Sequence, residues 1–272
     1  MNCTDAQAGG IPIYLFRINR CFCRSHGPAV KHRKGGSMVD IHCHALYGVD
    51  DGAGSIEESI AMLQQAKSQG VETIVLTPHY RHGMFDYPAE QIRTNFARLK
   101  QEAEQTGIAL YLGCEYHVDS RLLEALQENP CFSLAGGDFV LTEYSFDTDF
   151  SYIYMQTQKL ISCGYIPVIA HVERYGCFQK DPKLCPELSN TGAFIQINAD
   201  SVLGLEGRAG ERFCRKILKR GWADIVASDA HGIDTRACHL KKCMEYISRK
   251  YGEDYAELLF EENPQKAVEN KA

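Results

Sequence analysis

The sequence has no apolar run that approaches the roughly 20 residues needed to span a bilayer. Its longest early apolar run, residues 11–16, is flanked by Arg17 and Arg20. That run lacks the apolar length and the small-residue cleavage site of a signal peptide. An excess of positive charge is also absent. The 272 residues carry a net charge of −6, which indicates no basic surface for nucleic acid or an anionic membrane. These absences predict a cytoplasmic protein with no membrane insertion and no nucleic-acid partner.

The cysteine spacing of a zinc finger or a disulfide framework is absent as well. The chain has 12 cysteines, but they are scattered and none forms a CxxC motif. Cys21 and Cys23 have no partner pair at zinc-finger spacing. We therefore interpret the cysteines as reduced, small apolar residues of a cytoplasmic protein.

The signature of cysteine-dependent phosphatases, Cys-x5-Arg, occurs twice. One match runs from Cys214 to Arg220 and the other from Cys243 to Arg249. That chemistry needs a glycine-rich loop around the phosphate at a helix N-terminus and a thiolate of low pKa. Both matches lie in segments of helical pattern with no glycine between the Cys and the Arg. We interpret both as chance.

Residues 1–37 differ from the rest of the chain. They hold two glycine pairs and a basic stretch at residues 31–34, with no apolar period of a packed element. They are predicted to be an N-terminal extension that is disordered or not native, and residues 38–272 to form a single domain. Codons for Lys34-Gly35-Gly36 can contain a bacterial ribosome-binding sequence just before Met38, which favours an untranslated leader. The alternative is a real extension that caps the domain or binds a partner.

From Met38 onward, short β-rich runs alternate with longer segments of helical period. Ser55-Ile56-Glu57-Glu58 has the pattern of a helix capping box. Most of the β-rich runs are continuously apolar, as in strands buried on both faces. Strands that alternate with helices pair in parallel, and this number of units favours a closed or nearly closed barrel, a distorted (β/α)7 TIM-like barrel. An open doubly wound sheet is the alternative. The seven predicted strands are residues 39–42, 72–77, 109–113, 139–142, 166–170, 194–198 and 224–227.

Metal-ligating residue types follow almost every predicted strand. In a parallel barrel the carboxyl ends of all strands open on one face, so these residues are expected to converge there. Any one of them alone would more often be a hydrogen-bonded loop residue or a helix cap, but chance does not account for six strand ends out of seven. The candidates are five histidines, two glutamates and two aspartates: His42, His44, Asp51, His79, Glu115, Glu143, His171, Asp229 and His231.

Nine such groups at one opening would repel one another or lack partners without cations. They are enough to hold two or three divalent metal ions with bridging carboxylates. The ligands are nitrogen and oxygen without thiolate, so Mn²⁺, Fe and Zn²⁺ all fit. A divalent metal lowers the pKa of water toward ~7 and so enables attack on a phosphate ester at neutral pH.

These motifs resemble the polymerase-and-histidinol-phosphatase (PHP) superfamily. The motifs that carry the resemblance are DIHCH at residues 40–44, TPH at 77–79, Glu115, Glu143, IAH at 169–171 and SDAH at 228–231. Finer stretches are similar to the bacterial manganese-dependent protein-tyrosine phosphatases of the CpsB/CapC type, from capsule and exopolysaccharide clusters. Those stretches are VDDG at 49–52, GMF at 83–85, VIAHVERY at 168–175 and Asn263-Pro264.

The resemblance implies a PHP-type distorted barrel with a trinuclear centre, in which all nine candidates are metal ligands and Glu115 bridges. Mn²⁺ is the metal it favours. It implies that Arg174 and Arg236 bind phosphate, with Arg81 as a third contact. The implied substrate is a tyrosine-phosphorylated protein, namely a bacterial tyrosine autokinase that regulates polysaccharide synthesis. Two alternatives stay open: a small-molecule phosphatase such as histidinol phosphatase, and a regulatory binding protein of the same fold without catalysis.

Overall fold

The computed structural model describes residues 37–85, 88–129 and 132–269, so the predicted extension lies outside the described residues except for Ser37. The strands pair in parallel in two sheets, one in the order β1-β2-β4 and one in the order β3-β5-β6-β7-β8-β9. Their bounds are β1 (Met38–Cys43), β2 (Val71–Leu76), β3 (His79–Tyr80), β4 (Ala109–Leu112), β5 (Glu115–His117), β6 (Phe139–Glu143), β7 (Ile166–Ile169), β8 (Phe194–Asn198) and β9 (Ile225–Ala227).

Two of the predicted strands are each followed, after a break of two residues, by a further short strand that was not predicted. β3 follows β2 after two residues, and β5 follows β4 after Gly113 and Cys114. A Cβ at position 113 would lie 2.9 Å from a side-chain carbon of Leu134 and 3.3 Å from its Cα, so the close packing at the break favours glycine. Beyond the breaks, His79 and Glu115 are in direct register with each other in the six-stranded sheet. All seven predicted strands are present, and the two breaks bring together two predicted site residues.

The end of β9 closes the barrel against the end of β1. Cys43 and Ala230 form a parallel bridge. The Asp229 amide donates to the His42 carbonyl at 2.9 Å, and the His44 amide donates to the Ala230 carbonyl at 2.9 Å. The open doubly wound sheet is therefore wrong, and the (β/α)7 barrel is confirmed.

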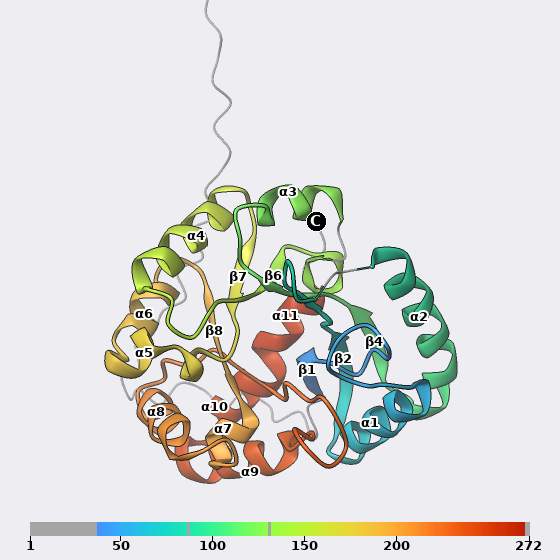
Figure 1. The fold of residues 1–272 in the computed structure, drawn as a ribbon. Coiled ribbons are helices and arrows are strands. Elements are labelled where there is room, and N and C mark those ends of the chain that lie inside the picture. The colour runs from blue at the N-terminus through green and yellow to red at the C-terminus, as the bar shows by residue number, and fades with distance from the viewer. Residues whose placement is uncertain (1–36, 86–87, 130–131, 270–272) are drawn as a thin grey trace, which may run out of the picture. The chain divides into compact units, whose positions relative to one another are not determined.

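Helices alternate with the strands and surround them (Figure 1). The predicted capping box is present, since the Ser55 hydroxyl accepts from the Glu58 amide at 3.2 Å, although the Glu58 carboxylate accepts from Gly54 instead of from Ser55. The helix bounds are α1 (Ile56–Ser68), α2 (Ala89–Glu102), α3 (Leu122–Glu128), α4 (Phe150–Ser162), α5 (Gly176–Lys180), α6 (Leu184–Ser189), α7 (Ala199–Leu203), α8 (Arg208–Leu218), α9 (Leu240–Tyr251), α10 (Glu253–Glu257) and α11 (Asn263–Glu269).

The barrel interior is filled by apolar side chains of the strands, and α11 completes it. Val39, Phe139 and Ile225 pack there together with Ala267 and Val268 of α11, and α11 is visible through the middle of the ring of strands (Figure 1). No helix among the described residues has the length and apolarity to cross a membrane. With its amino-terminal end filled, the barrel leaves only its carboxyl-terminal end for polar groups.

Candidate metal centre

The structure brings all nine predicted candidates together at the carboxyl-terminal end of the barrel. His42 is on β1, and His79 and Glu115 begin the short strands after the two breaks. Glu143 ends β6, while the other candidates stand in the loops that directly follow their strands. All of them except His171 form three groups of possible ligands, in each of which one ligand atom per residue lies within 4.8 Å of the others.

The first ligand group consists of His42, His44, Glu115 and Asp229, all of them buried. The Nε2 atom of His42 lies 3.1 Å from Glu115 Oε2 and 3.3 Å from Asp229 Oδ1. The Nε2 atom of His44 lies 3.3 Å from the same Glu115 oxygen. Two imidazole nitrogens and two carboxylate oxygens thus face one point.

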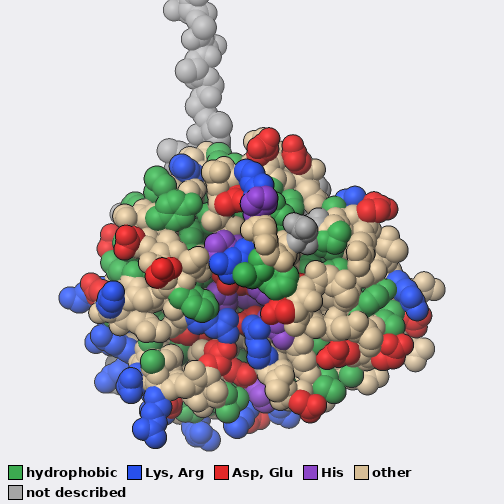
Figure 2. Space-filling view, in the orientation of Figure 1, with side chains coloured by type: hydrophobic (Ala, Val, Ile, Leu, Met, Phe, Trp, Pro, Cys, Tyr) green, Lys and Arg blue, Asp and Glu red, His purple; other side chains and the backbone are tan. Residues whose placement is uncertain are grey.

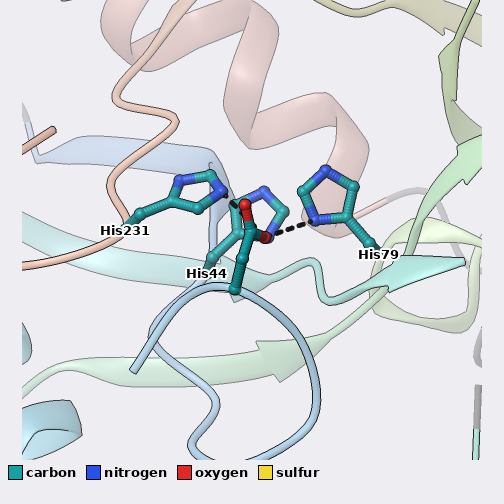
Figure 3. Close-up of side chains that lie close together, drawn as sticks. His44, His79 and His231 are labelled. Atoms are coloured by element: carbon teal, nitrogen blue, oxygen red, sulfur yellow. Dashed lines mark ion pairs between the residues drawn. The ribbon is translucent and has the colours of Figure 1, made fainter. Parts of the chain in front are cut away.

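The second ligand group consists of His44, Asp51, His79 and His231. Figure 3 shows the three imidazoles gathered from separate segments of the chain. The Asp51 Oδ1 atom lies 3.3 Å from His79 Nδ1 and 3.5 Å from His231 Nε2. The rings of His44 and His231 stack with centroids 3.9 Å apart.

The third ligand group consists of His79, Glu115 and Glu143. His171 adjoins it, with Nε2 at 2.8 Å from Glu115 Oε1 and 3.8 Å from Glu143 Oε1. The three groups share residues, since Glu115 belongs to the first and third and His79 to the second and third. This placement of Glu115 is the one that a bridging carboxylate requires.

Unsatisfied buried atoms support a fit to cations. Among the described residues, His171 Nδ1, Asp229 Oδ1 and His231 Nε2 are buried side-chain atoms without a hydrogen-bond partner. Each such atom costs about 1–3 kcal/mol unless something satisfies it. His231 Nδ1 lies 2.9 Å from the Asp229 carbonyl, and donation there leaves Nε2 with a free lone pair. The donor set therefore fits divalent cations.

The pKa values of the cluster show how strongly its charges depend on one another. Burial acts to lower the pKa of His42, but the carboxylates of Glu115 and Asp229 outweigh it and raise that pKa to about 9. Burial and the neighbouring Glu115 raise the pKa of Glu143 to about 7. Burial acts against ionisation of Asp229, yet nearby His42 and Arg174 hold its pKa well below the usual range. In the absence of cations, protons on histidine balance the carboxylates.

Supporting residues that the sequence analysis did not single out orient these ligands. The Asp50 carboxylate lies 2.8 Å from His44 Nδ1 and accepts from the His79 amide at 2.9 Å. The Gln196 side-chain oxygen accepts from the His171 amide at 2.8 Å and lies 3.3 Å from His42 Nδ1. The available signals were the position of Asp50 beside Asp51 and the polar Gln196 inside an otherwise apolar predicted strand.

Both predicted arginines converge on Asp229. Arg174 Nη1 and Arg236 Nη2 each lie 3.0 Å from Asp229 Oδ2. A second nitrogen of Arg174 pairs with Glu206, a loop residue that no sequence pattern marked. The two arginines line a depression of about 550 Å³ together with Phe146 and Glu206, among others. Arg81 is not among the lining residues, and its charge acts instead on Glu143.

The backbone at this centre is held in an uncommon conformation. Among the described residues, four other than glycine have positive φ, and three of these are predicted site residues: His171 (φ 31°), Asp229 (φ 51°) and Arg236 (φ 50°). Such conformations cost on the order of 1–3 kcal/mol each and concentrate at functional sites. These three backbone conformations therefore lower the stability of the fold while they orient the three side chains.

The two cysteines of the Cys-x5-Arg matches lie away from this centre. Cys214 is on α8 and Cys243 on α9, and both are fully buried. Burial raises the pKa of each thiol well above its ordinary value. Neither cysteine has the exposed, low-pKa thiolate that a nucleophile needs, in agreement with the interpretation of both matches as chance.

Comparison with known proteins gives matches over almost all of the described chain. Residues 38–269 match the family described as capsular polysaccharide synthesis, CpsB/CapC. The tyrosine-protein phosphatase CpsB of Streptococcus pneumoniae is 34% identical over 238 residues, which cover 85% of this chain and 98% of that protein. The tyrosine-protein phosphatase YwqE of Bacillus subtilis is 32% identical over 226 residues, covering 82% and 89%.

Solved structures agree with these matches. One, from work on YwqE of Bacillus subtilis and CpsB of Streptococcus pneumoniae described as unique metal-dependent tyrosine phosphatases, superposes with a TM-score of 0.80 at 31% identity. It covers 86% of this chain and 96% of its own. The phosphotriesterase homology protein of Escherichia coli has a TM-score of 0.55 at 12% identity, with 85% and 98% covered, a similarity that bears on the fold alone.

Proposed function

The chain belongs to the CpsB/CapC family, and from that premise we propose that it is a metal-dependent protein-tyrosine phosphatase. Its proposed substrate is a tyrosine-phosphorylated protein, namely a bacterial tyrosine autokinase that regulates capsular or exopolysaccharide synthesis in the cytoplasm. The observation that carries this proposal is the position of three ligand groups next to two arginines that line one depression.

The nine candidates are proposed as ligands of two or three Mn²⁺ ions, with Fe and Zn²⁺ as chemically acceptable substitutes. Bound divalent cations would supply a nucleophile from water at neutral pH and offset negative charge on the phosphoryl group. Glu115 would bridge, since its two oxygens face different sets of histidines.

The chain's own residues would bind and orient the phosphate ester. Arg174 and Arg236 can donate several charge-assisted hydrogen bonds to phosphoryl oxygens, and Asp229 holds both guanidinium groups in place. We propose Arg81 as a weaker, third contact, because its positive charge acts on Glu143 although it does not line the depression.

The aromatic lining of the depression favours an aryl ester. Phe146 is 56% exposed, and its loop is fixed next to Arg174 because the Gly176 amide donates to the Phe146 carbonyl at 2.8 Å. A tyrosyl ring placed against Phe146 would leave its phosphate facing the arginines. Tyrosine, with a pKa near ~10, is also a leaving group that needs little help from a general acid.

The decisive experiment compares substrates with the Mn²⁺-loaded protein. We expect a higher kcat/KM for a phosphotyrosine peptide than for histidinol phosphate or a phosphoserine peptide. Preference for histidinol phosphate would identify the small-molecule alternative. Absence of turnover on all three by the metal-loaded protein would favour the non-catalytic alternative.

A matched pair of variants tests the aromatic contact in the same assay. Phe146→Ala should lower kcat/KM for the phosphotyrosine peptide about 3- to 10-fold, the usual worth of one aromatic contact, and leave a small alkyl phosphate unaffected. Leu205→Ala is the control, because Leu205 is similarly exposed at 54% and is not among the residues lining the depression. Equal losses in the two variants would contradict the proposed role of Phe146.

Metal binding is expected to release protons. Because the pKa of His42 is raised to about 9, its ring is protonated at pH 7.5 without metal, and only the neutral ring can bind a cation. Below that pKa the apparent affinity for Mn²⁺ should therefore fall as the pH falls. Titration calorimetry in two buffers of different ionisation enthalpy should show release of at least about one proton. The same heat of binding in both buffers would contradict the expected release of protons.

A further inference from the structure

The net charge of −6 conceals a strongly basic face. Residues 208–220 and 240–251, which include α8 and α9, hold ten Lys and Arg against two Glu, a net charge of +8, so the rest of the chain carries −14. We call these ten side chains the basic face: Arg208, Arg212, Arg215, Lys216, Lys219, Arg220, Lys241, Lys242, Arg249 and Lys250. The sequence-based prediction of no basic surface holds for the total charge and is wrong for this face.

All ten side chains of the basic face are exposed. Both helices pack against α7, and the Arg215 side chain of α8 interacts with Tyr246 of α9. Figure 2 shows the Lys and Arg side chains gathered along the lower left edge, where Figure 1 places α8 and α9. Within the described part of the chain, Arg215 alone among the ten pairs with a carboxylate, that of Glu211 at 2.5 Å. The like charges therefore repel one another with little internal compensation, which an external anion would relieve.

The aromatic residues of this region have cations over their rings. Lys250 Nζ lies 5.0 Å from the ring centroid of Tyr246 and 5.4 Å from that of Tyr251. The Arg220 guanidinium lies 5.1 Å from the ring of Trp222, the one tryptophan of the chain. Tyr and Trp beside Lys and Arg are the combination that suits the headgroup region of a bilayer. Single-stranded nucleic acid would instead need free ring faces for base stacking, and each of these rings already has a cation over it.

We propose that the basic face binds the surface of an anionic lipid bilayer, with the protein held at the headgroups and not inserted. The charges extend along the whole of α8, a helix of 11 residues and so about 16 Å long, and along α9 beside it. That spread suits a planar array of anionic headgroups better than a single phosphate. None of the large exposed apolar side chains of the described residues is on α8 or α9 themselves, and the nearest in sequence is Leu205 in the loop before α8. The two helices therefore present charges, and no large exposed apolar side chain, to the acyl region.

This surface also bears on the proposed phosphatase activity, and this step rests on that proposed function. Ala209 and Gly210, in the first turn of α8, line the depression that holds Arg174 and Arg236. With the basic face against a bilayer, the opening of the depression would lie beside the lipid surface. Phosphotyrosines on segments close to the membrane would then be the accessible substrates.

The test is co-sedimentation of the full chain with vesicles. Binding is expected to vesicles of phosphatidylglycerol and phosphatidylcholine, not to vesicles of phosphatidylcholine alone, and it should weaken as salt is raised. The triple variant Lys216→Glu, Lys219→Glu, Lys242→Glu should bind on the order of 100-fold more weakly, because each basic residue near an anionic surface contributes several-fold in affinity. The matched control reverses three exposed charges on α2 and α4, Arg98→Glu, Lys100→Glu and Lys159→Glu, and should bind as the wild type does.

Activity measurements separate this proposal from the proposed function. None of the three substituted lysines lines the depression, so turnover of a soluble phosphotyrosine peptide should be unchanged in the variant, while turnover of the same peptide anchored to anionic vesicles should fall. If the protein bound vesicles but had no phosphatase activity, the proposal that the basic face binds a bilayer would stand and the proposed phosphatase function would be wrong. Equal binding by wild type and variant, or binding to polyglutamate or RNA without binding to anionic vesicles, would overturn the bilayer proposal.

Discussion

Asp229→Asn is expected to abolish both metal binding and phosphatase activity. The Oδ1 atom of Asp229 is a buried acceptor without a hydrogen-bond partner beside His42. Its Oδ2 atom forms an ion pair with Arg174 and accepts hydrogen bonds from Arg236 and Asn198. Loss of the carboxylate charge removes a ligand and loosens both arginines at once. We expect activity to fall by more than the roughly 100-fold that loss of a supporting partner costs a metal site.

Asparagine is the informative replacement at this position. Asp229 has φ of 51°, a conformation that asparagine tolerates and alanine does not, so Asp229→Asn separates the loss of charge from backbone strain. Metal content by mass spectrometry and turnover of an aryl phosphate should fall together. Asp200→Asn is the matched control, because Asp200 is also a buried aspartate but pairs with His239 outside the three ligand groups.

Chelation should have the same effect without a mutation. Removal of metal from the wild type should abolish turnover, and Mn²⁺ should restore it. Full activity in the metal-free protein would contradict the proposal that these residues hold a metal centre needed for activity.

Arg174→Ala should lower kcat by about 10² to 10³, the typical loss when one charge-stabilising donor is removed. Arg174 lines the depression and donates toward Asp229, so its guanidinium is placed to meet negative charge on a phosphoryl group. Arg174→Lys should recover only part of the activity, because a lysine cannot bridge Asp229 and a phosphate with a planar fork. The measurement is kcat and KM on a phosphotyrosine peptide.

Substitutions of two cysteines serve as a control, because they are expected to leave activity unchanged. Cys214→Ser and Cys243→Ser should retain near wild-type turnover, since both thiols are buried with raised pKa values. A folded but inactive Cys214→Ser protein together with an active Arg174→Ala protein would reverse the assigned chemistry. Circular dichroism of each variant is needed, because a hydroxyl in a buried apolar position costs stability.

The strands and the convergent residues could be predicted because each depends on a local signal. Apolar runs mark buried strands, and parallel topology alone then places every residue that follows a strand at one end of the barrel. The breaks at residues 77–78 and 113–114 could not be predicted, since the close packing at position 113 comes from Leu134, a residue remote in sequence.

The missed residues have a common physical reason. Asp50, Gln196 and Glu206 act through hydrogen bonds to residues remote in sequence, and no spacing along the chain encodes such a contact. The basic face was missed for a different reason. A net charge sums over the whole chain, and only the outward faces of α8 and α9 show that ten of its cations lie side by side.

The closure of β9 against β1 sets the order in which the centre can assemble as the chain is synthesised. The third ligand group draws on β3, β5 and the end of β6, so its residues are all present once residue 143 has been made. The first and second groups each need a residue that follows β9, either Asp229 or His231. Contacts between such distant segments form late, because the loop between them must first be ordered. A partly synthesised chain can therefore complete only the third group, and the other two gain their fourth candidate ligand only after the last strand has joined the first.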